Sequence, residues 1–123
     1  MKLGIVGSGG IVKDVLIALK PINTIEIQAI WVRPHSEAKG QTLAQENNIP
    51  QVYTDYEAFL GQADIDTAYI ALVNSAHYEY AKKALLAGHN VIVEKPFGSN
   101  LREVQELVHL AKDKHLFLWD AVS

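Results

Sequence analysis

The sequence contains no cysteine among its 123 residues. Disulfide bonds, thiolate nucleophiles and cysteine-ligated metal centres are therefore excluded from its chemistry. The apolar run near the N-terminus, "LGIVG", is too short for the core of a signal peptide or for a membrane span. These absences favour a cytoplasmic protein in a reducing compartment.

The sequence also lacks a charge excess of either sign. Its formal net charge is -3, charged residues make up 20% of it, and no long run carries one sign. This balance gives no electrostatic footprint for nucleic acid or for an anionic membrane. Hydrophobic residues make up 49%, and a chain of this length suits one domain with a real core.

What the sequence does have is a regular alternation of strand and helix signals. Apolar or β-rich runs predict strands at 3–6, 25–32, 51–54, 67–73, 90–93 and 116–119. Helical spacing predicts helices at 11–19, 36–48, 55–61, 75–87 and 101–111. Thr54 with Glu57, and Asn100 with Glu103, are typical of helix starts. The alternation predicts an α/β fold: a Rossmann doubly wound parallel sheet in the order 3-2-1-4-5-6, with helices on both faces.

A glycine-rich turn follows the first predicted strand. In "GIVGSGGIV", Gly7 and Gly9 match the first two glycines of G-x-G-x-x-G, and Val12 stands at the third. The first glycine permits the tight turn, and the second lets the backbone approach a pyrophosphate at the helix N-terminus. We expect Gly7, Gly9, Gly10 and Ile11 to bind a dinucleotide. The alternative is a glycine turn with no ligand.

The end of the second predicted strand bears on the choice of cofactor. An NAD site usually has an acidic residue there, on the ribose 2′-hydroxyl. This chain reads "IWVRP", with Arg33 and no carboxylate. A guanidinium pairs well with a 2′-phosphate, so NADP is favoured over NAD. The alternative is that Arg33 is a solvated loop residue.

Three segments together resemble a known family. "KLGIVGSGGIV", "YIALVNSAHYEYAKKALLAGHNVIVEKPFGSN" and "LFLWDA" are similar to the N-terminal domain of the glucose–fructose oxidoreductase / inositol dehydrogenase / rhizopine-catabolism oxidoreductases. The resemblance implies that residues 1–123 form an NAD(P)-binding domain. It also implies a second, C-terminal domain, absent from this chain, that supplies most of the substrate pocket and the usual homo-oligomer interface. The implied substrate is a sugar, polyol or related hydroxy or keto compound.

The resemblance also implies roles for individual residues. Lys95 matches the lysine of the family's Glu-Lys-Pro, which contacts the reacting oxygen of the substrate; a partly desolvated ammonium suits that task. Glu94 matches a contact to the nicotinamide side of the cofactor. Leu72, Asn74 and His77 match cofactor-side positions after the fourth strand. Leu72 and Val73 replace the Thr-Pro pair that many family members carry there.

Two other hypotheses for the function stay open at this point. One is a dinucleotide-sensing or interaction module with no chemistry of its own, and the other is a domain for a different nucleotide. No His, Asp and Glu grouping has metal-ligand spacing, so no metal site is expected. The remaining histidines are His35, His89, His109 and His115, and we expect them to be solvated. We expect the 123-residue chain alone to bind cofactor without turnover.

Overall fold

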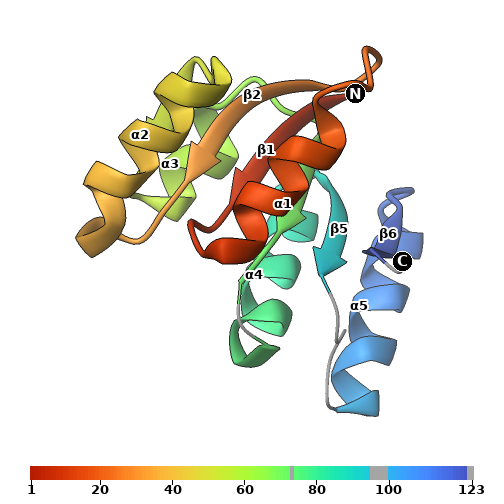
Figure 1. Ribbon diagram of the computed structural model, residues 1–123. Helices are drawn as coiled ribbons and strands as arrows, with labels where there is room; N and C mark the ends of the chain where they lie inside the picture. The colour runs from red at the N-terminus through yellow and green to blue at the C-terminus, as the bar shows by residue number, and fades with distance from the viewer. Residues whose placement is uncertain (73, 95–99, 122–123) are drawn as a thin grey trace.

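The computed structural model describes residues 1–72, 74–94 and 100–121. Its centre is a six-stranded parallel sheet in the order β3-β2-β1-β4-β5-β6 (Figure 1), which confirms the predicted strand order. The strands are β1 (Lys2–Val6), β2 (Glu26–Trp31), β3 (Gln51–Tyr53), β4 (Thr67–Ile70), β5 (Asn90–Glu94) and β6 (Leu118–Ala121). The helices are α1 (Gly10–Leu19), the 3₁₀ turn η1 (Pro34–Ser36), α2 (Glu37–Asn47), α3 (Tyr56–Gln62), α4 (Asn74–Leu86) and α5 (Leu101–Asp113).

Two helices, α3 and α5, begin at a residue whose side chain caps the helix N-terminus. The side chain of Asn100 accepts hydrogen bonds from the N–H groups of Arg102 and Glu103, so the predicted cap of α5 is confirmed. For α3 the prediction of a Thr54 cap is wrong. Asp55 is the N-cap, and its carboxylate accepts from the Ala58 N–H at 3.1 Å. Aspartate caps a helix as well as threonine does, and the chain enters α3 one residue later.

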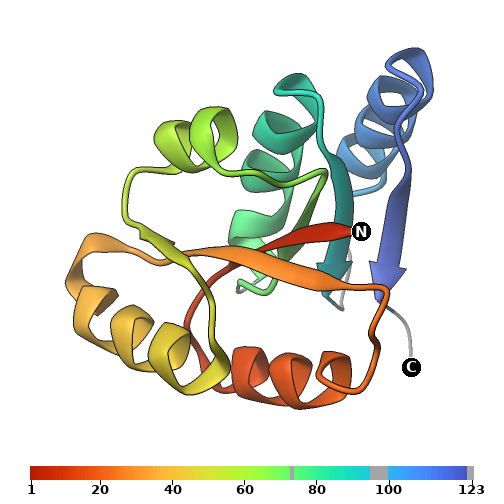
Figure 2. The same cartoon turned by 90° about the horizontal axis from the view of Figure 1, so that it is seen from above.

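The helices form two layers, one on each face of the sheet. Figure 2 shows α1 and α2 on one face and α3, α4 and α5 on the other. Two apolar clusters fill the space between the layers. One is centred on Phe59, Ile70, Leu85 and Leu107, beneath α3, α4 and α5. The other is centred on Leu3, Ile5, Val12 and Ile30, beneath α1 and α2. Strands such as β4, buried at every position, are typical of parallel sheets covered on both faces.

One of the histidines that we expected in solvent is buried. His89 is 9% exposed, and its Nε2 donates to the carbonyl oxygen of Leu60 at 2.7 Å. The prediction failed because the turn before β5 packs under the end of α3, which the sequence pattern does not reveal. None of the helices in the described residues has the length and apolar character needed to cross a membrane.

Candidate functional site

A cavity of about 250 Å³ opens at the carboxyl ends of the central strands. Its walls come from the turns that follow β1, β2 and β4, which are adjacent in the sheet although distant in sequence. Ligands of doubly wound folds bind at this edge, where the crossovers diverge to opposite faces. The lining residues are Gly7, Ser8, Gly9, Arg33, His35, Ser36, Ala71 and Leu72.

The first wall of this cavity is the glycine turn, and Gly7 is required there by geometry. Its φ is +127°, and a Cβ at this position would lie 2.7 Å from the carbonyl oxygen of Ala71. The Gly7 N–H donates to the carbonyl oxygen of Trp31 at 2.8 Å, so the turn is fastened to β2. A side chain at Gly7 would therefore strain the backbone and push β1 away from the β4 turn.

Gly9 has a different role from Gly7. It is the N-cap of α1 in extended backbone, with φ of -73°, and no side chain caps the helix. Cβ atoms at Gly9 and Gly10 would meet no protein atom within 4 Å. The uncapped N–H groups and the open space beside them suit a pyrophosphate, which needs donors and a close approach to the backbone. Ile11 is 45% exposed on the first turn of α1 and does not line the cavity.

The second wall carries Arg33 and the η1 turn. The Arg33 guanidinium carbon lies 6.0 Å from the ring centre of Trp31 and 5.8 Å from that of Tyr80. Its Nη1 donates to the Tyr80 hydroxyl at 3.5 Å. Among the described residues, no carboxylate lies within ion-pair distance of Arg33. The guanidinium is therefore a positive group at the cavity that no carboxylate of the described residues neutralises.

The third wall follows β4 and contains Leu72. His77, in the first turn of α4, is 1% exposed, and its Nε2 donates to the Leu72 carbonyl oxygen at 2.6 Å. The ring therefore fastens the β4–α4 turn and does not lie open in the cavity. Asn74 begins α4, but its side chain lies outside what the structure describes, as does Val73.

Beyond this cavity, at the end of β5, Glu94 accepts a hydrogen bond from the hydroxyl of Tyr69 on β4. Burial, and then the bond to this carboxylate, raise the pKa of Tyr69 well above its usual value. Tyr69 therefore stays protonated near neutral pH and remains a donor to Glu94. Lys95, the expected catalytic residue, lies outside the described residues.

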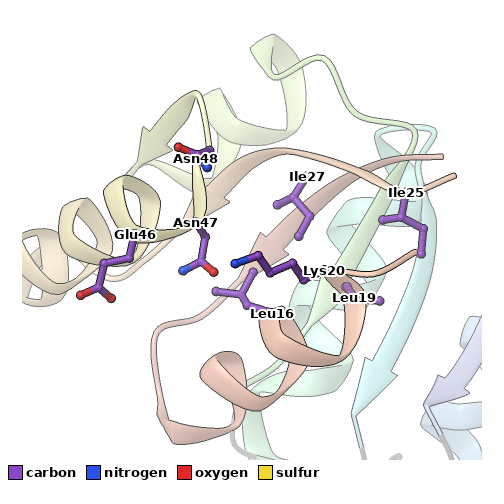
Figure 3. Close-up of a pocket in the computed structure, with 8 residues that line it drawn as sticks. All are labelled: Leu16, Leu19, Lys20, Ile25, Ile27, Glu46, Asn47 and Asn48. Carbon is purple, nitrogen blue, oxygen red and sulfur yellow. The ribbon is translucent and has the colours of Figure 1, made fainter. Parts of the chain in front are cut away.

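A second cavity of about 230 Å³ lies at the opposite edge of the sheet, between α1 and α2. Figure 3 shows Lys20 extending across it, while the Glu46 carboxylate points away. Leu16, Leu19, Ile25 and Ile27 form its apolar floor. It opens where β2 begins, so it is at the wrong end of the strands for a ligand of this fold. In the described part of the chain, no three His, Asp or Glu side chains are placed to hold a metal ion.

Sequence reasoning did not select four of the lining residues: Ser8, His35, Ser36 and Ala71. Three of them could have been found, because Ser8 lies inside the glycine motif and the other two directly follow Arg33 and Pro34. Residues that follow the first two strands of a Rossmann sheet meet at one edge. Nothing in the sequence around Ala71 indicated that this residue would line the cavity.

The fold and the position of the glycine turn define a dinucleotide-binding Rossmann domain. A profile described as "Oxidoreductase family, NAD-binding Rossmann fold" matches residues 1–121. The chain belongs to this family of NAD(P)-binding oxidoreductase domains, which confirms the resemblance found in the sequence.

Curated relatives and solved structures agree with this assignment. The trans-1,2-dihydrobenzene-1,2-diol dehydrogenase of Xenopus tropicalis is 32% identical over 120 residues, which cover 98% of this chain and 36% of that protein. The enzyme of the same name from Mus musculus is 33% identical over 122 residues, covering 99% and 37%. A 3-ketoreductase from Actinomadura kijaniata, solved with NADP and TDP-benzene, superimposes with a TM-score of 0.91 at 26% identity, covering 98% and 37%. The chain thus spans about a third of the length of these relatives.

Proposed function

We propose that this chain is the cofactor-binding part of an oxidoreductase that prefers NADP to NAD. The observation that carries the preference is Arg33, an unneutralised guanidinium on the wall of the cavity that the glycine turn also lines. A 2′-phosphate at this wall would gain a charge-assisted bond, whereas the 2′-hydroxyl of NAD would not. The described lining of the cavity contains no carboxylate to hold that hydroxyl.

The cavity walls suggest how the cofactor would be held. The pyrophosphate would lie against Gly9 and Gly10 at the N-terminus of α1, and the adenosine end would lie toward Arg33. Leu72 would contact the cofactor from the β4 turn, and His77 would fix that turn. Ile11 and Asn74 remain expected contacts from the sequence alone. Glu94 would face the nicotinamide end, next to Lys95.

The whole protein's reaction also belongs to this proposal. The bound nicotinamide would carry the hydride, and Lys95 would stabilise or deprotonate the reacting oxygen of a sugar, polyol or related hydroxy or keto compound. The curated relatives are nearly three times as long as this chain. We place the substrate pocket and any homo-oligomer contact in a second domain of the intact protein.

The cofactor preference is tested by titrating the chain with NADPH and NADH at one fixed salt concentration, following nicotinamide fluorescence. NADPH should bind more tightly, and Arg33→Ala should remove most of the difference while leaving NADH binding nearly unchanged. Equal affinities for the two cofactors in the unmodified chain would refute the preference. Arg102→Ala is the matched control, since Arg102 lies at the start of α5 and is not among the residues that line the cavity.

The proposal that the substrate pocket lies in a second domain is tested separately. The chain, NADPH and a set of keto sugars should give no substrate-dependent oxidation of NADPH. Turnover that disappears in Lys95→Ala would show that the chain alone contains the complete active site.

A further inference from the structure

Tyr80 on α4 stands behind Arg33 and is itself held firmly. Its ring centre lies 5.1 Å from that of Trp31 and 4.6 Å from that of Tyr56, the latter edge to face. The Tyr56 hydroxyl also donates to the backbone carbonyl of Tyr80 at 2.8 Å. Three rings from β2, α3 and α4 therefore form one aromatic cluster at the end of β2. Buried aromatic contacts of this kind restrict ring orientation.

The Arg33 side chain rests on this cluster. Its guanidinium lies within about 6 Å of two ring centres, the range in which a cation is attracted to an aromatic face. The Tyr80 hydroxyl accepts a long hydrogen bond from the same group. A free arginine samples many rotamers, and ordering it on a ligand costs binding free energy. An arginine already held by two rings is preorganised for that ligand.

We infer that Tyr80 is a positioning residue that sets the preference for the 2′-phosphate, because it holds Arg33 at the cavity wall. The inference rests on the proposed function and extends it to a residue on α4 that does not line the cavity. Tyr80 acts through Arg33, so its contribution appears only with ligands that carry the 2′-phosphate. A purely structural residue would weaken every nucleotide alike.

The test uses two probes that differ only by the 2′-phosphate, 2′,5′-ADP and 5′-AMP, measured by calorimetry on the full chain. Tyr80→Leu should weaken the binding of 2′,5′-ADP about fivefold, the size expected for loss of one cation–π contact, and leave the binding of 5′-AMP unchanged. Tyr80→Phe keeps the ring and should cost less than about twofold, because the 3.5 Å hydrogen bond is weak. Tyr78→Leu is the matched control. Tyr78 is on the same helix, but its hydroxyl donates to Glu106 on α5.

A double-mutant cycle makes the test specific to Arg33. In an Arg33→Ala background, Tyr80→Leu should cause no further loss of 2′,5′-ADP affinity. If Tyr80→Leu unfolds the chain, pentafluorophenylalanine at position 80 keeps the ring shape and removes the attraction for cations. The chain with pentafluorophenylalanine at position 80 should then bind 2′,5′-ADP more weakly than the Tyr80→Phe variant does.

The outcomes separate the two proposals. If Arg33→Ala removes the preference for 2′,5′-ADP and the Tyr80 substitutions do not change it, the role of Tyr80 is overturned and the role of Arg33 stands. Equal weakening of both probes by Tyr80→Leu also overturns it. If the unmodified chain does not distinguish the two probes, both proposals are wrong.

Discussion

The two halves of the sheet differ in how fully the chain covers them. The half containing β1, β2 and β3 has α1 and α2 on one face and packs against α3 on the other (Figure 2). The half containing β4, β5 and β6 has α4 and α5 on one face, but its other face is less covered toward β6. Two tryptophans show the difference: Trp31 at the end of β2 is 3% exposed, whereas Trp119 in β6 is 56% exposed.

A row of side chains across the second half shows the same decrease in coverage toward β6. Tyr69, Ile92 and Trp119 are aligned neighbours in β4, β5 and β6. Their exposure rises along this row from buried through intermediate to exposed. The half with β1, β2 and β3, which supplies most of the lining of the first cavity, is therefore covered on both faces within this chain. The half that contains Glu94 leaves apolar surface in solvent, as expected if a further domain packs there.

The largest difference between the two halves is expected when each tryptophan is truncated. Trp31→Ala should lower the free energy of unfolding by about 3 to 5 kcal/mol, because a large side chain is lost from a packed core. Trp119→Ala should change it by less than about 1 kcal/mol, since this side chain is mostly exposed and its ring stacks on Phe117 at 4.3 Å between centres. Urea unfolding measures both. Equal losses would show that β6 is as well packed as β2.

Within the first half, the two glycines of the turn should separate folding from binding. Gly7→Ala should destabilise the chain by about 1 to 3 kcal/mol, because the alanine would have a positive φ and a 2.7 Å contact with Ala71. Gly9→Ala should leave stability within about 0.5 kcal/mol and weaken NADPH about tenfold, since its methyl group would occupy the open space beside α1. Thermal unfolding and NADPH titration of both variants provide the check. Loss of stability without loss of binding in Gly9→Ala would contradict this assignment.

A smaller effect is expected at high pH, from one tyrosine on β4 and one on α3. The pKa values of Tyr69 and Tyr56 are raised in the native state, in each case chiefly by burial. The native chain therefore keeps protons that the unfolded chain releases above about pH 10, and stability should fall as pH rises beyond that value. It should be unchanged between pH 7 and 9. Tyr69→Phe should make the alkaline fall shallower in urea unfolding series, and a fall as steep as that of the unmodified chain would contradict this expectation.

The fold could be predicted from the sequence because its strand, helix and turn patterns all indicate the same topology. Apolar runs, helical stripes and turn residues alternate regularly, and parallel crossovers of one hand leave few topologies. The glycine turn and Arg33 were found for the same reason, since each follows directly from a strand. The position of His89 was missed because its partner Leu60 lies 29 residues away and nothing local indicates the contact.

The supporting contacts of the site could not be predicted in the same way. The bond from Tyr69 to Glu94 depends on the register of β4 against β5, across 25 residues. The contact of Tyr80 with Arg33 spans 47 residues and depends on the rotation of α4 about its axis. A hydrophobic pattern fixes which face of a helix is buried, but not which partner each buried ring will meet.

We expect the first half of the sheet to hold the phosphate-bearing end of a dinucleotide. The most direct measurement is an amide NMR titration of the ¹⁵N-labelled chain with NADPH. We predict the largest shifts at Gly7 to Gly10 and at Arg33 to Ser36, and none at Lys20 or Asn48 beside the second cavity (Figure 3). Shifts centred on Lys20 and Asn48, or no shifts at saturating NADPH, would contradict it.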